Sequence, residues 1–264
     1  MRVVRFEDDR GQVRLGEWTA DGQARLIDGD LFGGFVVRSE TAAVRRLLAP
    51  VVPANIYGIG LNYRRHAAEG GQQVPDEPLV FLKPTTAAIG HEDPIVLPAD
   101  APDEVDYEGE LAVVIGRTAR RVPEARAAEH VLGYTCANDV SARDCQFRRD
   151  RQWARAKGFD TFCPLGPCLL IDPARDPQSF AIRTTLNGRV MQASTTADMV
   201  FSVARLISYL SHQFTLLPGT VILTGTPEGV GWTRKPPVFL RDGDRVTVEI
   251  EGIGALSNPV RAGR

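Results

Sequence analysis

Short runs of strand length recur along this chain, and turn signals separate most of them. The first fifty residues alternate apolar and polar positions in RVVRF, VRLGEW and ARLID, with Gly- and Asp-rich turns between the runs. Alternation with a period of two is typical of half-buried strands. Further strand-like runs follow in NIYGIG, LVFLK, ELAVVIG, AIRTTL, VMQAS, TVILTG and RVTVEIEGIG. The pattern predicts an α+β fold dominated by β structure, without the regular βαβ rhythm of a parallel sheet.

Three segments carry helical signals. A short helix is expected over residues 41–49 (TAAVRRLLA), which Pro53 closes, and another over residues 123–132 (PEARAAEHVL), which starts at a proline. The longest is expected over residues 196–213, where apolar residues at helical spacing predict a helix packed on a sheet. The break near residue 50 predicts a small N-terminal β domain over residues 1–50 and a main domain over residues 51–264.

Composition excludes several classes of protein. Thirty-one Lys and Arg against thirty-three Asp and Glu give a formal net charge of −2, so no general field attracts nucleic acid or an anionic membrane. No run approaches the roughly 18 apolar residues of a membrane span, and MRVVRFEDD lacks an apolar signal core, so we expect a cytoplasmic protein. The four cysteines lack CxxC spacing, so we expect reduced and mostly buried thiols.

Two glutamates stand two positions apart in VDYEGELAVVIG, residues 105–116. Residues i and i+2 of a strand project from the same face, so Glu108 and Glu110 should lie side by side. Two carboxylates that close repel each other, and one must take up a proton unless a cation is present. The pair leads directly into the apolar run LAVVIG, which places it at the mouth of a core. A metal site and a solvated edge strand are both open at this point.

Asp139 follows the strand-like segment 135–137 in ANDVSARDCQ. On its own this position is more typical of a helix start, with Asp139 or Ser141 as the capping residue. The capping role is compatible with a metal role. An aspartate that joined the glutamate pair would complete an all-carboxylate site, and hard oxygen ligands suit Mg²⁺, Mn²⁺ or Ca²⁺ better than zinc or copper.

His66 and Glu69 stand three positions apart in GLNYRRHAAEGG, residues 60–71. On a helical turn such residues are neighbours, so Glu69 can orient His66 and raise its basicity, although a lone histidine is more often structural. The flanking glycines favour a mobile turn over a fixed helix, as a lid needs. Two further segments, ARAKGFDTFCPLGP and LTGTPEGVG, lack the glycine spacing of a phosphate-binding loop.

Taken together and in order, these segments resemble the fumarylacetoacetate hydrolase family. The matching strings are GLNYRRHAAE, FLKP, VDYEGELAVVIG, NDVSARDCQ, KGFDTFCPLGP, LTGTPEGVG and GDRVTVEIEGIGALSNPV, and they cover residues 52–262. Residues 1–50 resemble the short, variable N-terminal domain of smaller bacterial members. The resemblance implies a β-rich mixed sandwich or roll, a divalent metal such as Mg²⁺, and a homodimer.

The resemblance also implies roles for individual positions. The family's metal carboxylates fall on Glu108, Glu110 and Asp139. Its catalytic positions, two in a lid and one beside the metal, fall on His66, Glu69 and Lys157. Its substrate-contacting positions fall on Arg143, Gln146 and Thr226.

The residue types themselves suggest a reaction. A metal held by three carboxylates keeps open positions that a small 2-oxo acid can occupy through its carboxylate and keto oxygens. We expect C–C bond hydrolysis of a 2,4-diketo acid, such as an acylpyruvate or a diketo sugar acid. Water activated by His66 would attack, and a pyruvate enolate stabilised by the metal and Lys157 would leave.

Two alternatives share these residues. Decarboxylation of an oxaloacetate-like acid is one. Keto–enol or double-bond isomerisation is the other, as for 2-hydroxyhepta-2,4-diene-1,7-dioate in aromatic catabolism. A hypothesis from another class is a catalytically silent, metal-stabilised binding module, but a purely structural metal would not need His66, Glu69 and Lys157.

Overall fold

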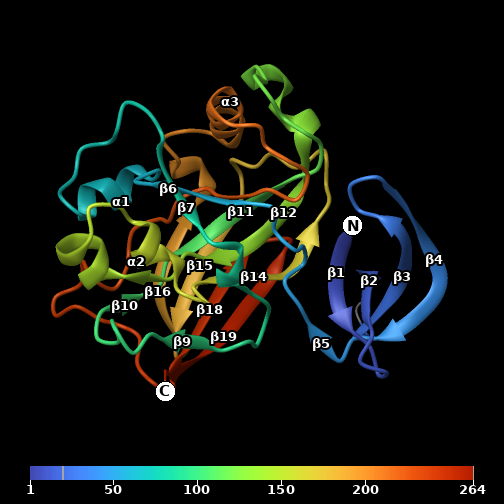
Figure 1. Cartoon of the computed structure of the whole chain (residues 1–264), viewed down its shortest axis with the longest axis horizontal. Coiled ribbons are helices and arrows are strands. Elements are labelled where there is room, and N and C mark those ends of the chain that lie inside the picture. The colour runs from blue at the N-terminus through green and yellow to red at the C-terminus, as the bar shows by residue number, and fades with distance from the viewer. Residues whose placement is uncertain (20, 264) are drawn as a thin grey trace.

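The structure is a computed structural model that describes residues 1–19 and 21–263. Strands dominate it, and most of them join one mixed sheet (Figure 1). Along that sheet the strands run in the order β4 (Gly34–Ala43), β3 (Gln23–Asp30), β2 (Val13–Trp18), β1 (Arg2–Glu7), β14 (Cys163–Leu170), β12 (Val131–Asn138), β11 (Gly109–Ile115), β17 (Val221–Leu223), β6 (Ile56–Gly60) and β7 (Leu79–Lys83). Two short strands extend it, β5 (Arg46–Leu47) beside β1 and β8 (Ala88–Ile89) beside β14.

Two smaller sheets and a few helices complete the described chain. The first sheet runs in the order β16 (Arg189–Thr195), β15 (Ala181–Leu186), β18 (Arg245–Ile250), β19 (Gly254–Ala262) and β9 (Ile95–Leu97), and the second pairs β10 (Val105–Asp106) with β13 (Ser141–Ala142). The α-helices are α1 (Arg64–Glu69), α2 (Ala154–Gly158) and α3 (Val203–Gln213). Short 3₁₀ helices cover Thr85–Ala87, Glu124–His130 and Thr196–Asp198, and Cys145–Arg149 forms a π-helical turn. The predicted β-dominated α+β class is confirmed.

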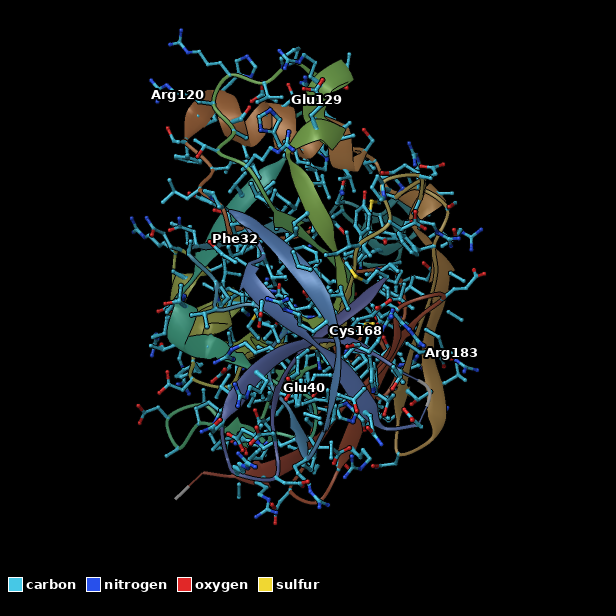
Figure 2. All side chains as sticks on the ribbon, turned by 90° about the vertical axis from the view of Figure 1, so that its right-hand side faces the viewer. Phe32, Glu40, Arg120, Glu129, Cys168 and Arg183 are labelled. Carbon is cyan, nitrogen blue, oxygen red and sulfur yellow. The ribbon has the colours of Figure 1, made fainter. Side chains whose placement is uncertain are left out.

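The N-terminal strands form an antiparallel meander that lies to one side of the molecule (Figures 1 and 2). They are joined to the central sheet, because β1 pairs with β14 at Arg2↔Leu170 and Val3↔Leu169. The division of the chain near residue 50 stays a prediction.

Residues 41–49 do not form the predicted helix. Here β4 continues to Ala43, opposite Gln23, and β5 places Leu47 opposite Phe6. The backbone hydrogen bonds with β3 and β1 outweigh the weak helical preference of the segment. The long helix predicted over residues 196–213 is shorter than expected, since α3 begins only at Val203, where the Ser202 side chain caps it.

The core lies on both faces of β11. Leu111, Val113 and Ile115 belong to a buried cluster with residues of α3 and β18, whereas Ala112 and Val114 belong to another that includes residues of the N-terminal strands. Because residues of a strand alternate between faces, these two clusters bury β11 on both sides. Glu110, the second residue of β11, is therefore held at the end of a rigid, buried strand.

All four cysteines, Cys136, Cys145, Cys163 and Cys168, are free and buried, as predicted. Burial raises the pKa of the Cys168 thiol to about 12, which makes a thiolate role at neutral pH unfavourable. Among the described residues, no helix has both the length and the apolar character needed to cross a membrane.

Candidate active site

The three predicted metal carboxylates meet at the start of β11. Glu110 is the second residue of β11, Glu108 directly precedes the strand, and Asp139 directly follows the neighbouring strand β12. The pairing of Gly109 with Asn138 sets this register, and the Asp139 N–H donates to the Glu108 carbonyl oxygen over 2.8 Å. All three side chains are buried, and one oxygen of each lies within 4.8 Å of the others.

Asp139 is therefore not the capping residue that its sequence position favoured. Ser141 does not cap a helix either, because it lies in β13 and its hydroxyl donates to the Asp139 carbonyl oxygen over 2.9 Å. The following π-helical turn starts instead at Asp144, whose side chain accepts from the Cys145 N–H.

Electrostatics at the carboxylates favour a bound cation. Burial, together with the charges of Asp139 and Glu108, raises the pKa of Glu110 well above its usual range, even though Glu110 accepts a hydrogen bond from the Gly225 N–H over 2.7 Å. A divalent cation between the carboxylates would remove this penalty. The set contains only oxygen donors, so these residues fit Mg²⁺, Mn²⁺ or Ca²⁺.

Lys157 on α2 lies against the same carboxylates. Its Nζ donates to Glu108 Oε2 and to Asp139 Oδ2, each over 2.6 Å. Burial lowers the pKa of Lys157, but the charges of Asp139 and Glu108 outweigh burial and the net shift is upward. Burial likewise opposes ionisation of Glu108, yet Lys157 and Arg143 hold the pKa of Glu108 below its usual range. Lys157 thus carries its positive charge at the triad.

Arg143 joins the carboxylates to the predicted substrate positions. Its Nε donates to Asp106 Oδ2 over 2.9 Å, its Nη1 donates to Gln146 Oε1 over 2.7 Å, and its Nη2 lies 2.7 Å from Glu108 Oε1. Nη2 is buried yet makes no well-directed hydrogen bond within the described chain. Nη2 also lies 2.9 Å from Asp106 Oδ2, so the guanidinium is paired with two carboxylates, and it lines the cavity described below.

Asp106 is a buried residue that the sequence reasoning did not single out. Besides Arg143, its carboxylate accepts from the backbone N–H of Gly231 over 2.8 Å and of Trp232 over 3.1 Å. Asp106 thus ties Arg143 to the loop that carries Trp232. Its position two residues before Glu108 was the available signal, since strand alternation places it on the same face.

Thr226 is placed by a second residue that the sequence reasoning missed, Gln192 on β16. The Gln192 amide donates to Thr226 Oγ1 over 2.8 Å, and it accepts from the Gly109 N–H over 2.9 Å. Thr226 Oγ1 donates to the Gly109 carbonyl oxygen over 3.0 Å. Gln192 therefore fixes the threonine beside the start of β11. No sequence pattern around Gln192 distinguished it from an ordinary strand residue.

His66 projects from α1 and is buried. Its Nδ1 lies 3.8 Å from Glu69 Oε2, which is too long for a hydrogen bond, and it has no other hydrogen-bond partner within the described residues. Glu69 Oε2 instead accepts from the Gly229 N–H over 2.9 Å. Burial raises the pKa of Glu69, but His66 and the Gly229 N–H outweigh it, so the net shift is downward. The structure therefore brings His66 and Glu69 close together, but no hydrogen bond from Glu69 fixes the orientation of the His66 ring.

Residues 64–69 form the short helix α1, where the flanking glycines favoured a turn, and the mobility of this segment stays a prediction. Helix α1 has no side-chain cap, and hydrogen bonds to distant segments hold it instead. Asn62 donates to the Thr224 carbonyl oxygen over 2.7 Å and accepts from the Phe201 N–H over 2.8 Å. Arg64 donates to the Asp198 carbonyl oxygen over 3.0 Å. These partners lie far away in sequence and replace the local stabilisation that the sequence lacks.

One narrow cavity of about 40 Å³ gathers most of the predicted site. Seven of the nine predicted residues line it, namely His66, Glu108, Glu110, Arg143, Gln146, Lys157 and Thr226. Asp139 and Glu69 are not in the lining, but each contacts a residue that is, Asp139 through Lys157 and Glu69 through His66. Four aromatic rings also line the cavity in two contacts, Phe147 with Trp232 at 5.1 Å and Phe81 with Trp153 at 5.7 Å between ring centroids. The volume and the cationic side chains suit a small anion.

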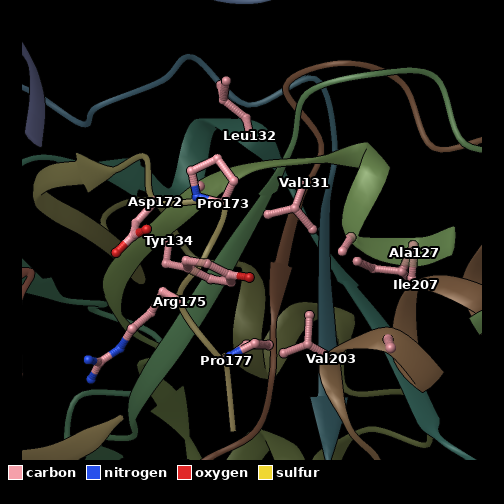
Figure 3. A pocket seen from close by; sticks show the side chains of 13 residues that line it. Ala127, Val131, Leu132, Tyr134, Asp172, Pro173, Arg175, Pro177, Val203 and Ile207 are labelled. Atoms are coloured by element: carbon pink, nitrogen blue, oxygen red, sulfur yellow. The ribbon is translucent and has the colours of Figure 1, made fainter. Parts of the chain in front are cut away.

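A second cavity, of about 110 Å³, lies elsewhere, between the 3₁₀ helix Glu124–His130, the start of β12 and α3. Figure 3 shows Val131, Val203 and Ile207 around the Tyr134 ring. Burial raises the pKa of the Tyr134 hydroxyl to about 12, and none of the predicted site residues lines this cavity. Its walls are mostly apolar, with Asp172 and Arg175 as the charged lining residues.

Comparisons with known proteins agree with this geometry. The family described as fumarylacetoacetate (FAA) hydrolase C-terminal matches residues 55–261. A mitochondrial oxaloacetate tautomerase of Xenopus laevis is 50% identical over 217 residues, which cover 81% of this chain and 68% of that protein. A mitochondrial oxaloacetate tautomerase of Homo sapiens is 48% identical over 216 residues, with the same coverage.

Solved structures are similar over the whole chain. A 5-carboxymethyl-2-hydroxymuconate delta-isomerase from Mycobacterium smegmatis is 47% identical with a TM-score of 0.88, covering 100% of both chains. A 2-hydroxyhepta-2,4-diene-1,7-dioate isomerase from Mycobacterium marinum is 42% identical with a TM-score of 0.86, covering 99% of this chain and 98% of the other. The family match, these identities and the assembled carboxylate site lead to one conclusion: this chain belongs to the fumarylacetoacetate hydrolase family.

Proposed function

We propose that this chain is a divalent-metal-dependent enzyme that interconverts the keto and enol forms, or shifts a double bond, of a short 2-oxo acid. One observation carries the proposal: two carboxylates of a triad fit for a cation, Glu108 and Glu110, line the same narrow cavity as His66, whose buried Nδ1 has no hydrogen-bond partner within the described residues. Relatives over this domain are named oxaloacetate tautomerase and 2-hydroxyhepta-2,4-diene-1,7-dioate isomerase. Oxaloacetate is therefore the first substrate to test.

Substrate binding falls to the cationic and hydroxyl side chains of the cavity. Arg143 and Thr226 bind the carboxylate of the 2-oxo acid, and Gln146 keeps the guanidinium in place. Lys157 offsets negative charge at the substrate oxygen. A divalent cation held by the triad, for which Mg²⁺ is the first candidate and Mn²⁺ or Ca²⁺ the alternatives, would polarise the keto group as a Lewis acid.

Proton transfer falls to His66. Its imidazole takes a proton from the carbon next to the keto group and returns one to the oxygen, so that one C–H bond breaks and one O–H bond forms. The reverse transfer restores the keto form. Neither step needs an attacking water molecule.

Hydrolysis of a C–C bond, which the sequence favoured, is the second candidate. Glu69 lies close enough to His66 that a shift of about 1 Å would make a hydrogen bond, and an imidazole oriented in this way activates water. Decarboxylation of oxaloacetate needs the same residues and no water. We favour tautomerisation over both, because Glu69 does not hydrogen-bond to His66 Nδ1 and the similar proteins include oxaloacetate tautomerases.

Three assays on one preparation test the proposal. With Mg²⁺ or Mn²⁺ present, we expect the chain to accelerate the enol-to-keto conversion of oxaloacetate, followed by ultraviolet absorbance, well above the buffer rate. Cleavage of an acylpyruvate to pyruvate and loss of CO₂ from oxaloacetate should both be slower. Rapid acylpyruvate cleavage with no effect on oxaloacetate tautomerisation would show that hydrolysis is the function.

We also propose a homodimer built on the free side of β7. This strand ends the order of the large sheet, and a groove of about 570 Å³ beside it is lined by apolar side chains. Leu79, Leu82 and Phe214 are 40%, 52% and 45% exposed there, and a second copy of the chain could cover them. Light scattering should give twice 28.8 kDa for the wild type and a smaller mass for Leu82→Asp. A monomeric wild type would contradict it.

A further inference from the structure

Lys83, the last residue of β7, is a buried lysine with no role assigned above. Its side chain has no exposed surface. Its Nζ donates to Asp139 Oδ1 and lies 3.4 Å from the Val140 carbonyl oxygen, and no other carboxylate pairs with it within the described chain. Lys83 does not line the cavity of the triad, so it cannot touch a substrate there. Burying an ammonium group is costly unless the group is paired, so the fold retains Lys83 for its contact with Asp139.

The Asp139 carboxylate is held on both sides. The Lys83 Nζ donates to Asp139 Oδ1, and the Nζ of Lys157, which lines the cavity, donates to Asp139 Oδ2 over 2.6 Å. We propose that Lys83 is a positioning residue: it fixes the Asp139 carboxylate in the orientation that faces the cation, and it holds that orientation when Lys157 turns to the substrate. The inference rests on the proposed metal site at Glu108, Glu110 and Asp139.

Charge alone predicts the opposite effect. A positive group near the triad repels a divalent cation, so its removal should strengthen metal binding if charge were all that mattered. If Lys83 positions Asp139, its removal should weaken binding, since the loss of a group that orients a metal ligand costs about 10- to 100-fold in affinity. The two accounts differ in sign and can be separated by one titration.

The test is calorimetric titration of Mn²⁺ into the full chain as wild type, Lys83→Met and Lys83→Gln. Methionine keeps the length and loses both charge and hydrogen bond, whereas glutamine loses the charge and keeps a donor. We expect binding at least about tenfold weaker in Lys83→Met, and a smaller loss in Lys83→Gln. Unchanged or tighter binding in Lys83→Met, or an equal loss in the two variants, would overturn the inference.

Two controls make the Mn²⁺ titrations interpretable. If Lys83→Met does not fold, as judged by circular dichroism, Lys83→Gln decides alone: weaker Mn²⁺ binding supports the inference, and unchanged or tighter binding overturns it. The wild-type titration separates the role of Lys83 from the proposed metal site on which it rests. A wild type that binds no divalent ion refutes the metal site itself, whereas a binding wild type with an unaffected Lys83→Met refutes only the role of Lys83.

Discussion

Glu110→Ala should abolish metal-dependent turnover, and excess chelator should do the same to the wild type. Glu110 is buried and supplies one of the three oxygens that lie within 4.8 Å of one another. Its removal leaves two carboxylates, both of which are shared with Lys157, too few to hold a weakly binding dication in competition with water. Turnover of oxaloacetate before and after chelation, and after Mg²⁺ or Mn²⁺ is returned, measures the effect.

A matched substitution shows whether the loss is specific. Glu129→Ala removes a glutamate whose partner is Arg126 on the exposed 3₁₀ helix, and it should leave activity unchanged. Wild-type turnover in excess chelator, or full activity of Glu110→Ala, would refute the metal site.

The stability of metal-free Glu110→Gln gives a readout that does not depend on activity. Because the pKa of Glu110 is raised in the folded chain, the unfolded chain ionises first as pH rises, and the fold loses stability between the unfolded and the folded pKa. Glutamine cannot ionise, so without metal the variant should melt above the wild type at neutral pH. With Mn²⁺ the order should reverse, since only the wild type keeps all three ligands.

The triad was predictable because its strongest element is local. Glu108 and Glu110 are two residues apart beside an apolar strand, and strand geometry alone puts them together. The third ligand, Asp139, had a competing local interpretation as a helix cap, and only the family resemblance favoured the metal role. In the structure the pairing of β11 with β12 brings it to the glutamates.

The residues that support the triad could not be predicted, because their contacts join segments that are distant in the sequence. Lys83 and Asp139 are 56 residues apart, and Gln192 and Thr226 are 34 apart. A lysine at the end of the apolar run LVFLK was visible in the sequence, but nothing local showed which acid it would meet. The error at residues 41–49 has the same origin: strand partners earlier in the chain decided a segment that looked helical by itself.

His66→Ala should lower turnover by roughly 10²- to 10⁴-fold, the range expected for a lost proton-transfer group, while Mn²⁺ affinity stays near that of the wild type. The histidine lines the cavity beside the triad without a hydrogen bond to any described residue. His212→Ala is the matched control, because His212 lies on α3 outside the cavity and its Nδ1 lies 2.8 Å from the Ser208 carbonyl oxygen, a contact within its own helix. That variant should keep full activity.

The reaction that His66→Ala loses also identifies the chemistry. Tautomerisation and hydrolysis both need a proton moved by the imidazole, whereas decarboxylation releases CO₂ without an attacking water and should be spared more. Wild type and His66→Ala are compared on enol oxaloacetate, on CO₂ release and on an acylpyruvate. A large loss confined to tautomerisation supports the shuttle proposed for His66, and a large loss confined to acylpyruvate cleavage assigns His66 to water activation with Glu69. Equal activity of the two proteins in all three assays would remove α1 from the mechanism and leave the triad with Lys157 and Arg143 as the whole catalytic apparatus.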